Sequence, residues 1–202
     1  VACKSTGVDR AEKAANAMQA QHKALADAPD KINGVVTTLN GLAEPGVDMK
    51  KQWGLFNDAV AGLASHRSRI QNLGKEIESN RAGFMEEWQK RLDAITDEEL
   101  RQRSSDRRDA VVQKFAELSA DADAGKAAFE PWMETVTSLQ AYLENDLNPS
   151  GVASVTDKIE EVSNGAAPIN AAIQKVVDGL DAMAASIQAG KPPAPTDGTT
   201  AA

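Results

Sequence analysis

Residues 151–188, GVASVTDKIEEVSNGAAPINAAIQKVVDGLDAMAASIQ, decide the fold. Apolar or small residues follow one another there at alternating steps of three and four: Val152, Val155, Ile159, Val162, Ala166, Ile169, Ile173, Val176, Leu180, Met183 and Ile187. An average step of 3.5 residues places all of them on one slowly winding stripe of a helix. The spacing therefore predicts a helix over 149–189.

Three earlier segments carry the same spacing and predict helices over about 7–43, 48–95 and 97–147. In the segment 97–147 the stripe is Val111, Phe115, Leu118, Ala122, Gly125, Phe129, Trp132, Val136, Leu139 and Leu143. In the segment 48–95 one row repeats every seven residues: Phe56, Leu63, Ile70, Ile77 and Phe84. Its companion row is polar only in the middle: Trp53, Val60, Arg67, Gly74, Arg81, Trp88 and Ile95.

Four stripes joined by short turns bury one another as an antiparallel bundle. We expect an all-α, elongated four-helix bundle with coiled-coil packing over 7–189. Segments of this length give helices of roughly 55–75 Å at 1.5 Å per residue. Two helical hairpins that each seek a partner chain are the alternative. Residues 1–6 form a linker, and the Pro-rich segment 190–202 forms a flexible tail.

The composition agrees with long helices. The chain has 202 residues, of which 35 are alanines, and aromatic residues make up only 4%. A β-sandwich or barrel requires short alternating runs of β-branched and aromatic residues instead. The net charge of −8 argues against a nucleic-acid partner, which favours a dense basic face.

Local signals mark the helix ends and irregularities. Thr96, with Glu99 three residues later, predicts a capping box at the start of the third helix. Asn148 before Pro149 predicts an N-cap followed by proline at the first helical position. Three prolines at 29, 131 and 168 lie in or beside stripes and predict kinks or short breaks.

Arg67 and Arg81 lie on the seam of the second predicted helix, that is, on the stripe that faces the other helices. An unpaired charge is costly there. For Arg67 we expect Asp121 or Asp123 as a partner, unless both Arg67 and Arg81 extend past the seam on their methylene stems. Alanine and glycine line the middle of the folded rod, so we expect a thin waist there.

Motifs for metal or nucleophilic chemistry are missing from the sequence. Di-iron bundles need Glu three residues before His, but Gln19 precedes His22 and Leu63 precedes His66. We expect His22 to be a satisfied core histidine and His66 to be half exposed. The single cysteine excludes an internal disulfide, and neither a zinc spacing nor a Gly-x-Ser-x-Gly elbow occurs. We expect no catalytic residues, no metal, no cofactor and no enzymatic activity.

The N-terminal residues Val1-Ala2-Cys3-Lys4-Ser5 match the end of a bacterial lipobox, in which a small residue precedes a cysteine. In that chemistry the thiol receives a diacylglycerol before a peptidase cuts in front of it. We expect Cys3 to be the lipid-attachment residue, with the hydrophobic leader upstream. The implied location is the periplasmic face of the cell envelope, the outer membrane more than the inner one. Multiple acyl chains would anchor the protein firmly.

Four arginines at 101, 103, 107 and 108 follow the acidic residues 97–99. This cluster could bind phosphate or lipid headgroups. Acidic residues within one helical turn on both sides favour local ion pairs on a solvated face instead.

A familiar pattern runs from Phe84-Met85-Glu86-Glu87-Trp88 through Leu92 to Leu100-Arg101-Gln102-Arg103-Ser104 and Arg107-Arg108. Pro131 and 143–148 (LENDLN) extend it. With Cys3 ahead, the chain resembles a family of uncharacterised bacterial envelope proteins, domain-of-unknown-function family twenty-nine fifty-nine, over nearly its whole length. The resemblance implies a helical lipoprotein or secreted protein and carries over no activity or catalytic residue.

The sequence therefore predicts a non-enzymatic, lipid-anchored helical scaffold or adaptor, with the membrane and a protein partner as contacts. Self-assembly or membrane coating is the alternative. Apolar residues off the stripes could supply that surface: Leu55, Leu73, Val112, Met133, Tyr142 and Val177. They more often widen the buried face of a helix. A small-ligand bundle or enzyme would need a pocket at the waist or at a proline break, with Arg67 or Arg81 holding an anion.

Overall fold

The computed structural model describes residues 7–188, and helices account for nearly all of this range. The helices are α1 (Gly7–Ala26), α2 (Ala28–Asn40), α3 (Met49–Asp93), α4 (Glu98–Asn145), α5 (Pro149–Ala153) and α6 (Thr156–Gln188). A short 3₁₀ helix, η1 (Gly41–Ala43), follows α2. No strand occurs within residues 7–188, so the all-α prediction is confirmed.

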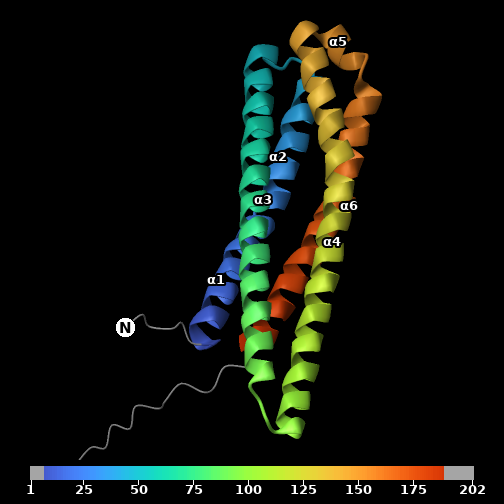
Figure 1. Cartoon of the computed structure of the whole chain (residues 1–202). Coiled ribbons are helices and arrows are strands. Elements are labelled where there is room, and N and C mark those ends of the chain that lie inside the picture. The colour runs from blue at the N-terminus through green and yellow to red at the C-terminus, as the bar shows by residue number, and fades with distance from the viewer. Residues whose placement is uncertain (1–6, 189–202) are drawn as a thin grey trace, which may run out of the picture.

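The helices form an antiparallel bundle, as the stripes predict (Figure 1). The α1–α2 pair runs up one corner and packs against α3 and α6, while α4 packs chiefly on α6. The α3–α4 hairpin spans the full length of the rod, and its tip reaches beyond the described ends of α1 and α6 (Figure 1). At 1.5 Å per residue, the 48 residues of α4 are about 72 Å long.

Only one of the three prolines interrupts a helix. The first predicted helix breaks at Asp27, directly before α2, where Pro29 occupies the first turn. Pro131 and Pro168 lie inside the uninterrupted helices α4 and α6. The fourth predicted helix breaks elsewhere, at residues 154–155 between α5 and α6.

The start of α4 differs from the predicted capping box. Asp97, not Thr96, is the N-cap, and its side chain accepts a hydrogen bond from the Leu100 backbone N–H at 3.0 Å. Glu99 pairs with Arg103 instead of reaching back to the cap. A carboxylate at the cap also complements the positive end of the helix dipole, which favours Asp97 over the hydroxyl. At α5 the prediction is confirmed, because Asn148 accepts from the Gly151 N–H at 3.0 Å.

The core is divided into two clusters along the rod. The cluster near the α5 end draws buried side chains from α2, α3, α4 and α6, including Phe56, Val60 and Leu63 of α3. The second cluster draws its buried side chains from α1, α4 and α6 alone, and α3 contributes only partly buried ones. Between Leu63 and Leu92, α3 has no buried residue. The rod is therefore fully packed in one half and open along α3 in the other.

The predicted stripes locate the core with one clear error. In the fourth stripe, which runs through α5 and α6, the residues from Val152 to Met183 are buried or half-buried, whereas Ala122 in the α4 stripe is exposed. Cys3 and the segment 190–202 lie outside the described residues, so the lipid-attachment and tail predictions have no structural counterpart.

Candidate functional site

Three arginines cross the seam between α3 and α4, and each lies over an aromatic ring of the opposite helix. The guanidinium carbon of Arg67 is 5.9 Å from the ring centre of Phe129. That of Arg81 is 5.7 Å from Phe115, and that of Arg107 is 5.8 Å from Trp88. Cation–π contacts of this kind are worth about 0.5–1 kcal/mol at exposed sites. The second half of the seam is therefore joined by arginine–aromatic contacts instead of apolar layers.

The acidic partner predicted for Arg67 is wrong. Its Nη2 donates to Oε1 of Glu130 at 2.5 Å, not to Asp121 or Asp123. Glu130 directly follows Phe129, so the residue that stacks on the guanidinium and the residue that neutralises it are neighbours on α4. Glu130 lies seven residues, or about two helical turns, further along α4 than Asp123.

Arg81 has its acidic partner on its own helix. Its Nε and Nη2 donate to the two carboxylate oxygens of Glu78 at 2.9 and 2.5 Å. The hydrogen bonds from Arg81 lower the pKa of Glu78, and the bond to Glu78 raises the pKa of Arg81. The Glu78 side chain is 63% exposed, so solvent weakens the pair.

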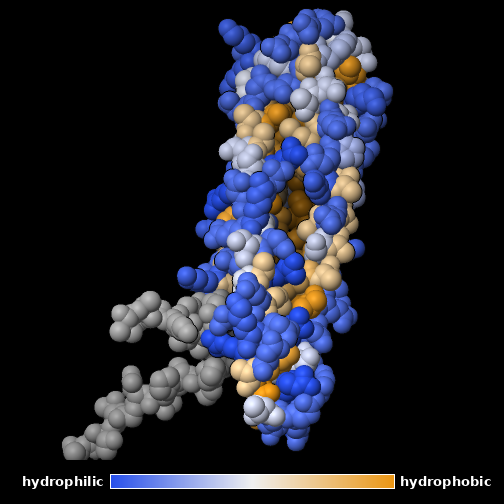
Figure 2. Space-filling view, in the orientation of Figure 1, coloured by the Kyte–Doolittle hydropathy of each residue, from blue (hydrophilic) through white to orange (hydrophobic). Residues whose placement is uncertain are grey.

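Between these two arginines the seam has a layer of small residues. Arg67 and Arg81 are two heptads apart on α3, and so are Phe115 and Phe129 on α4. The heptad positions halfway between them are Gly74 and Ala122. We call this layer the Gly74–Ala122 gap. Figure 2 shows a hollow between α3 and α4, with hydrophobic side chains at its bottom and hydrophilic ones on its rims.

A buried amide lies behind the gap. Gln21 of α1 is 8% exposed, and its Oε1 has no hydrogen-bond partner among the residues that the structure describes. Its Nε2 is 3.9 Å from the position that a Cβ on Gly74 would take. A buried, unpaired acceptor costs about 1–3 kcal/mol, so this is not a sealed apolar core.

A second hollow, of about 510 Å³, lies at the helix break before Pro29. His66 reaches across it from α3, with Nε2 2.7 Å from the carbonyl oxygen of Ala24. The lining contains both acidic and basic side chains, so it does not favour a ligand of either charge. It consists of Asp27, Asp30, Lys31, Gly62, Ser65, His66 and Arg69.

Both histidines are partly exposed and lie at the edge of the core. His66 is half-buried, as predicted. The side chain of His22 is 34% exposed, and its Nε2 is 3.3 Å from a carboxylate oxygen of Asp181, so it lies at the edge of the core. Within residues 7–188, no group of three or more His, Cys, Asp or Glu side chains is arranged to hold a metal ion.

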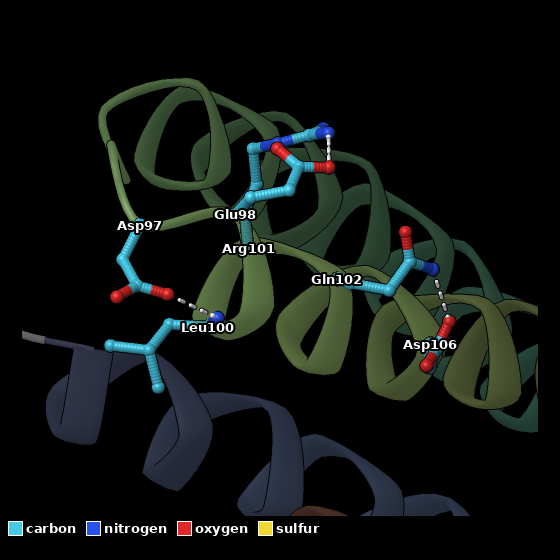
Figure 3. Close-up of polar contacts among 6 residues, drawn as sticks. All are labelled: Asp97, Glu98, Leu100, Arg101, Gln102 and Asp106. Atoms are coloured by element: carbon cyan, nitrogen blue, oxygen red, sulfur yellow. Dashed lines mark hydrogen bonds and ion pairs between the residues drawn. The ribbon is translucent and has the colours of Figure 1, made fainter.

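Three of the four arginines near the start of α4 make local ion pairs, as the sequence indicates. Figure 3 shows the pair between Arg101 and Glu98. Arg101 donates to Glu98 at 2.9 and 2.5 Å, and this bond lowers the pKa of Glu98. Arg103 pairs with Glu99, and Arg108 lies 3.2 Å from Asp109. Arg107 is close to these arginines in the sequence, but its guanidinium lies over the ring of Trp88 and so forms part of the α3–α4 seam. Trp88 also donates to Ser104 Oγ at 3.1 Å.

The off-stripe apolar residues divide by exposure. Leu55, Val112 and Tyr142 are exposed, Leu73 and Met133 are half-buried, and Val177 is buried. Leu100, which is not among the off-stripe residues selected from the sequence, is 57% exposed near the tip of the hairpin. Among the helices of residues 7–188, none combines the length and the hydropathy that crossing a bilayer requires.

Together these features define an elongated, all-α four-helix bundle whose α3–α4 seam is joined by arginine–aromatic contacts. Residues 2–187 match the family described as "Protein of unknown function (DUF2959)". The chain therefore belongs to this family, which confirms the resemblance to domain-of-unknown-function family twenty-nine fifty-nine. No curated protein and no solved structure matches the chain.

Proposed function

We propose that this protein is a non-enzymatic, lipid-anchored helical scaffold or adaptor of the bacterial cell envelope. The observation that carries the proposal is the length of α3 and α4, which run for 45 and 48 residues without interruption. Helices of this length form a rod that can hold two contacts far apart. The Ala2-Cys3 pair supports an anchor at the end of the chain that precedes α1.

Lipid attachment is tested on the full chain expressed with its own leader in a bacterial host. Mass spectrometry of the N-terminal peptide from envelope fractions is expected to find Cys3 with a diacylglycerol and no residues before it. Cys3→Ala is expected to move the protein out of the membrane fraction, whereas the matched Ser5→Ala leaves it there. An unmodified Cys3 with the upstream peptide still attached would contradict the anchor.

The adaptor role is tested by crosslinking in envelope fractions with the anchor intact. One defined partner, crosslinked to residues on the outer faces of α3 or α4, is the expected result. Recovery of the protein without any crosslinked partner, over a range of crosslinker lengths, would contradict an adaptor.

Self-assembly is the second candidate, and the exposed apolar side chains of Leu55, Leu100, Val112 and Tyr142 favour it. They lie on α3 and α4, the two helices that span the rod. Light scattering behind size-exclusion chromatography separates the candidates. A mass that rises with concentration supports assembly, and a strict monomer over a wide range excludes it.

A further inference from the structure

We propose that the Gly74–Ala122 gap binds one long alkyl chain of an anionic amphiphile, such as a fatty acid. The chain lies along the seam between Arg67 and Arg81, with its acidic head at Arg81. This inference goes beyond the scaffold role and does not depend on lipid attachment at Cys3.

The gap has the chemistry for an alkyl chain. Its bottom is hydrophobic (Figure 2), and Ile70 and Ile77 of α3 are only partly buried at the same level. Ala122 is exposed although it lies on the apolar stripe of α4. Apolar surface that the helices themselves do not cover favours an apolar ligand.

The dimensions of the gap favour a chain over a helix. Arg67 over Phe129 closes one end and Arg81 over Phe115 closes the other, two heptads or about 21 Å along α3. Because a single side chain from each helix spans the seam at both ends, α3 and α4 lie close together. A helix, which is about 10 Å wide, does not fit between them, whereas an extended alkyl chain does.

The charges of the seam favour an anionic head. Three arginines at 67, 81 and 107 face two glutamates at 78 and 130, although the whole chain carries a net charge of −8. Arg67 and Glu130 are both about two-thirds buried, so this pair stays closed. Glu78 is mostly exposed and gives way more easily to another carboxylate. The acidic head therefore lies at Arg81, toward Arg107.

The buried amide of Gln21 is the second sign that the gap is incomplete. Its Oε1 is unpaired, and its Nε2 lies 3.9 Å from the position of a Cβ built on Gly74, where a well-packed bundle has apolar side chains in contact. Gly74 leaves room at this point, since only Gln21 comes within 4 Å of a Cβ built there.

The test is calorimetric titration of the full chain with palmitate below its micelle concentration. We expect saturable binding of one palmitate per chain. Gly74→Leu fills the gap and is expected to weaken binding at least tenfold. The matched control is Gly83→Leu, which makes the same exchange on α3 at an exposed position with nothing within 4 Å. If Gly74→Leu does not fold, Ala122→Leu fills the gap from the exposed opposite wall.

The position of the head is tested with hexadecanol, which has the same chain without the charge. Hexadecanol is expected to bind at least tenfold more weakly than palmitate, and Arg81→Gln to remove that difference without changing hexadecanol binding. Equal binding of acid and alcohol, or equal binding of palmitate by wild type and Gly74→Leu, would overturn the proposal. A wild-type dimer that Gly74→Leu dissociates would also overturn it, because a second copy would then occupy the gap.

Discussion

At the residue scale, two glycines on long helices have opposite roles. A Cβ on Gly165 would lie 2.6 Å from Cδ1 of Trp132, a ring fixed by burial and by its hydrogen bond to the Val162 carbonyl at 2.8 Å. Gly83 has nothing within 4 Å of that position. The first glycine is required by packing, and the second only weakens α3.

Gly165→Ala is therefore expected to lower the free energy of unfolding by about 1–3 kcal/mol, the usual cost of overpacking a core. Gly83→Ala is expected to raise it by up to about 1 kcal/mol through helix propensity. Chemical denaturation of both variants measures the two signs. The same sign for both substitutions would contradict the contact with Trp132.

The ion pair between Arg67 and Glu130 is tested by a double-mutant cycle. Arg67→Gln and Glu130→Gln are expected to couple by about 0.5–1 kcal/mol, since both side chains are about one-third exposed. The matched cycle with Asp121→Asn is expected to give no coupling. A larger coupling to Asp121 than to Glu130 would support the partner expected from the sequence instead.

The residues of the seam could be predicted only in part. The heptad rows place Arg67, Gly74 and Arg81 on the seam. They therefore also predict a layer of small residues between the two arginines. Their partners could not be predicted, because a shift of one heptad, or about two turns, between two helices exchanges Asp123 for Glu130 without changing either stripe. The equal two-heptad spacing of Arg67 and Arg81 and of Phe115 and Phe129 is the signal that could have fixed the register.

At the scale of single helices, Pro131 and Pro168 remain inside α4 and α6 although each removes a backbone hydrogen bond. Both are exposed, so replacing them leaves no cavity. We expect Pro131→Ala and Pro168→Ala each to raise the free energy of unfolding by about 1–3 kcal/mol. Pro29 lies in the first turn of α2, where proline is tolerated, so Pro29→Ala is expected to change it by less than about 0.5 kcal/mol. Thermal and urea unfolding of the three variants provides the comparison, and an equal gain at all three sites would contradict it.

Acid is expected to destabilise the α3–α4 hairpin through its glutamates. Hydrogen bonds from Arg81, Lys90 and Arg101 lower the pKa values of Glu78, Glu86 and Glu98 below the ordinary 4.5. A carboxylate with a lowered pKa in the folded state stabilises it above its unfolded pKa, and this stabilisation is lost as the pH falls through the folded pKa.

The wild-type free energy of unfolding is therefore expected to fall between about pH 5 and pH 3. A variant with Gln at positions 78, 86 and 98 is expected to show a shallower fall, measured by urea unfolding across that range. Parallel curves for the two proteins would show that these pairs do not contribute. High salt is expected to reduce the difference, since all three pairs are on the surface.

At the scale of the whole molecule, the number of long helices and their antiparallel order follow from the sequence, because four equal stripes have few other ways to be buried. The unequal packing of the two halves does not follow. The α3 rows look continuous through Ile70, Ile77 and Phe84, yet these residues are only half-buried. Arginines in the neighbouring row join α3 to α4 through contacts with aromatic rings. A pattern that divides residues only into apolar and polar does not predict such contacts.

The proposed ligand site depends on an α3 that is tightly packed up to Leu63 and loosely packed from Ile70 to Trp88. Hydrogen exchange of backbone amides, followed by mass spectrometry on the unliganded full chain, measures this directly. Amides at 70–88 are expected to exchange faster than those at 56–63 and than those of α6 at the same level, since few buried contacts oppose local opening. Equal protection along the whole of α3 would contradict the account.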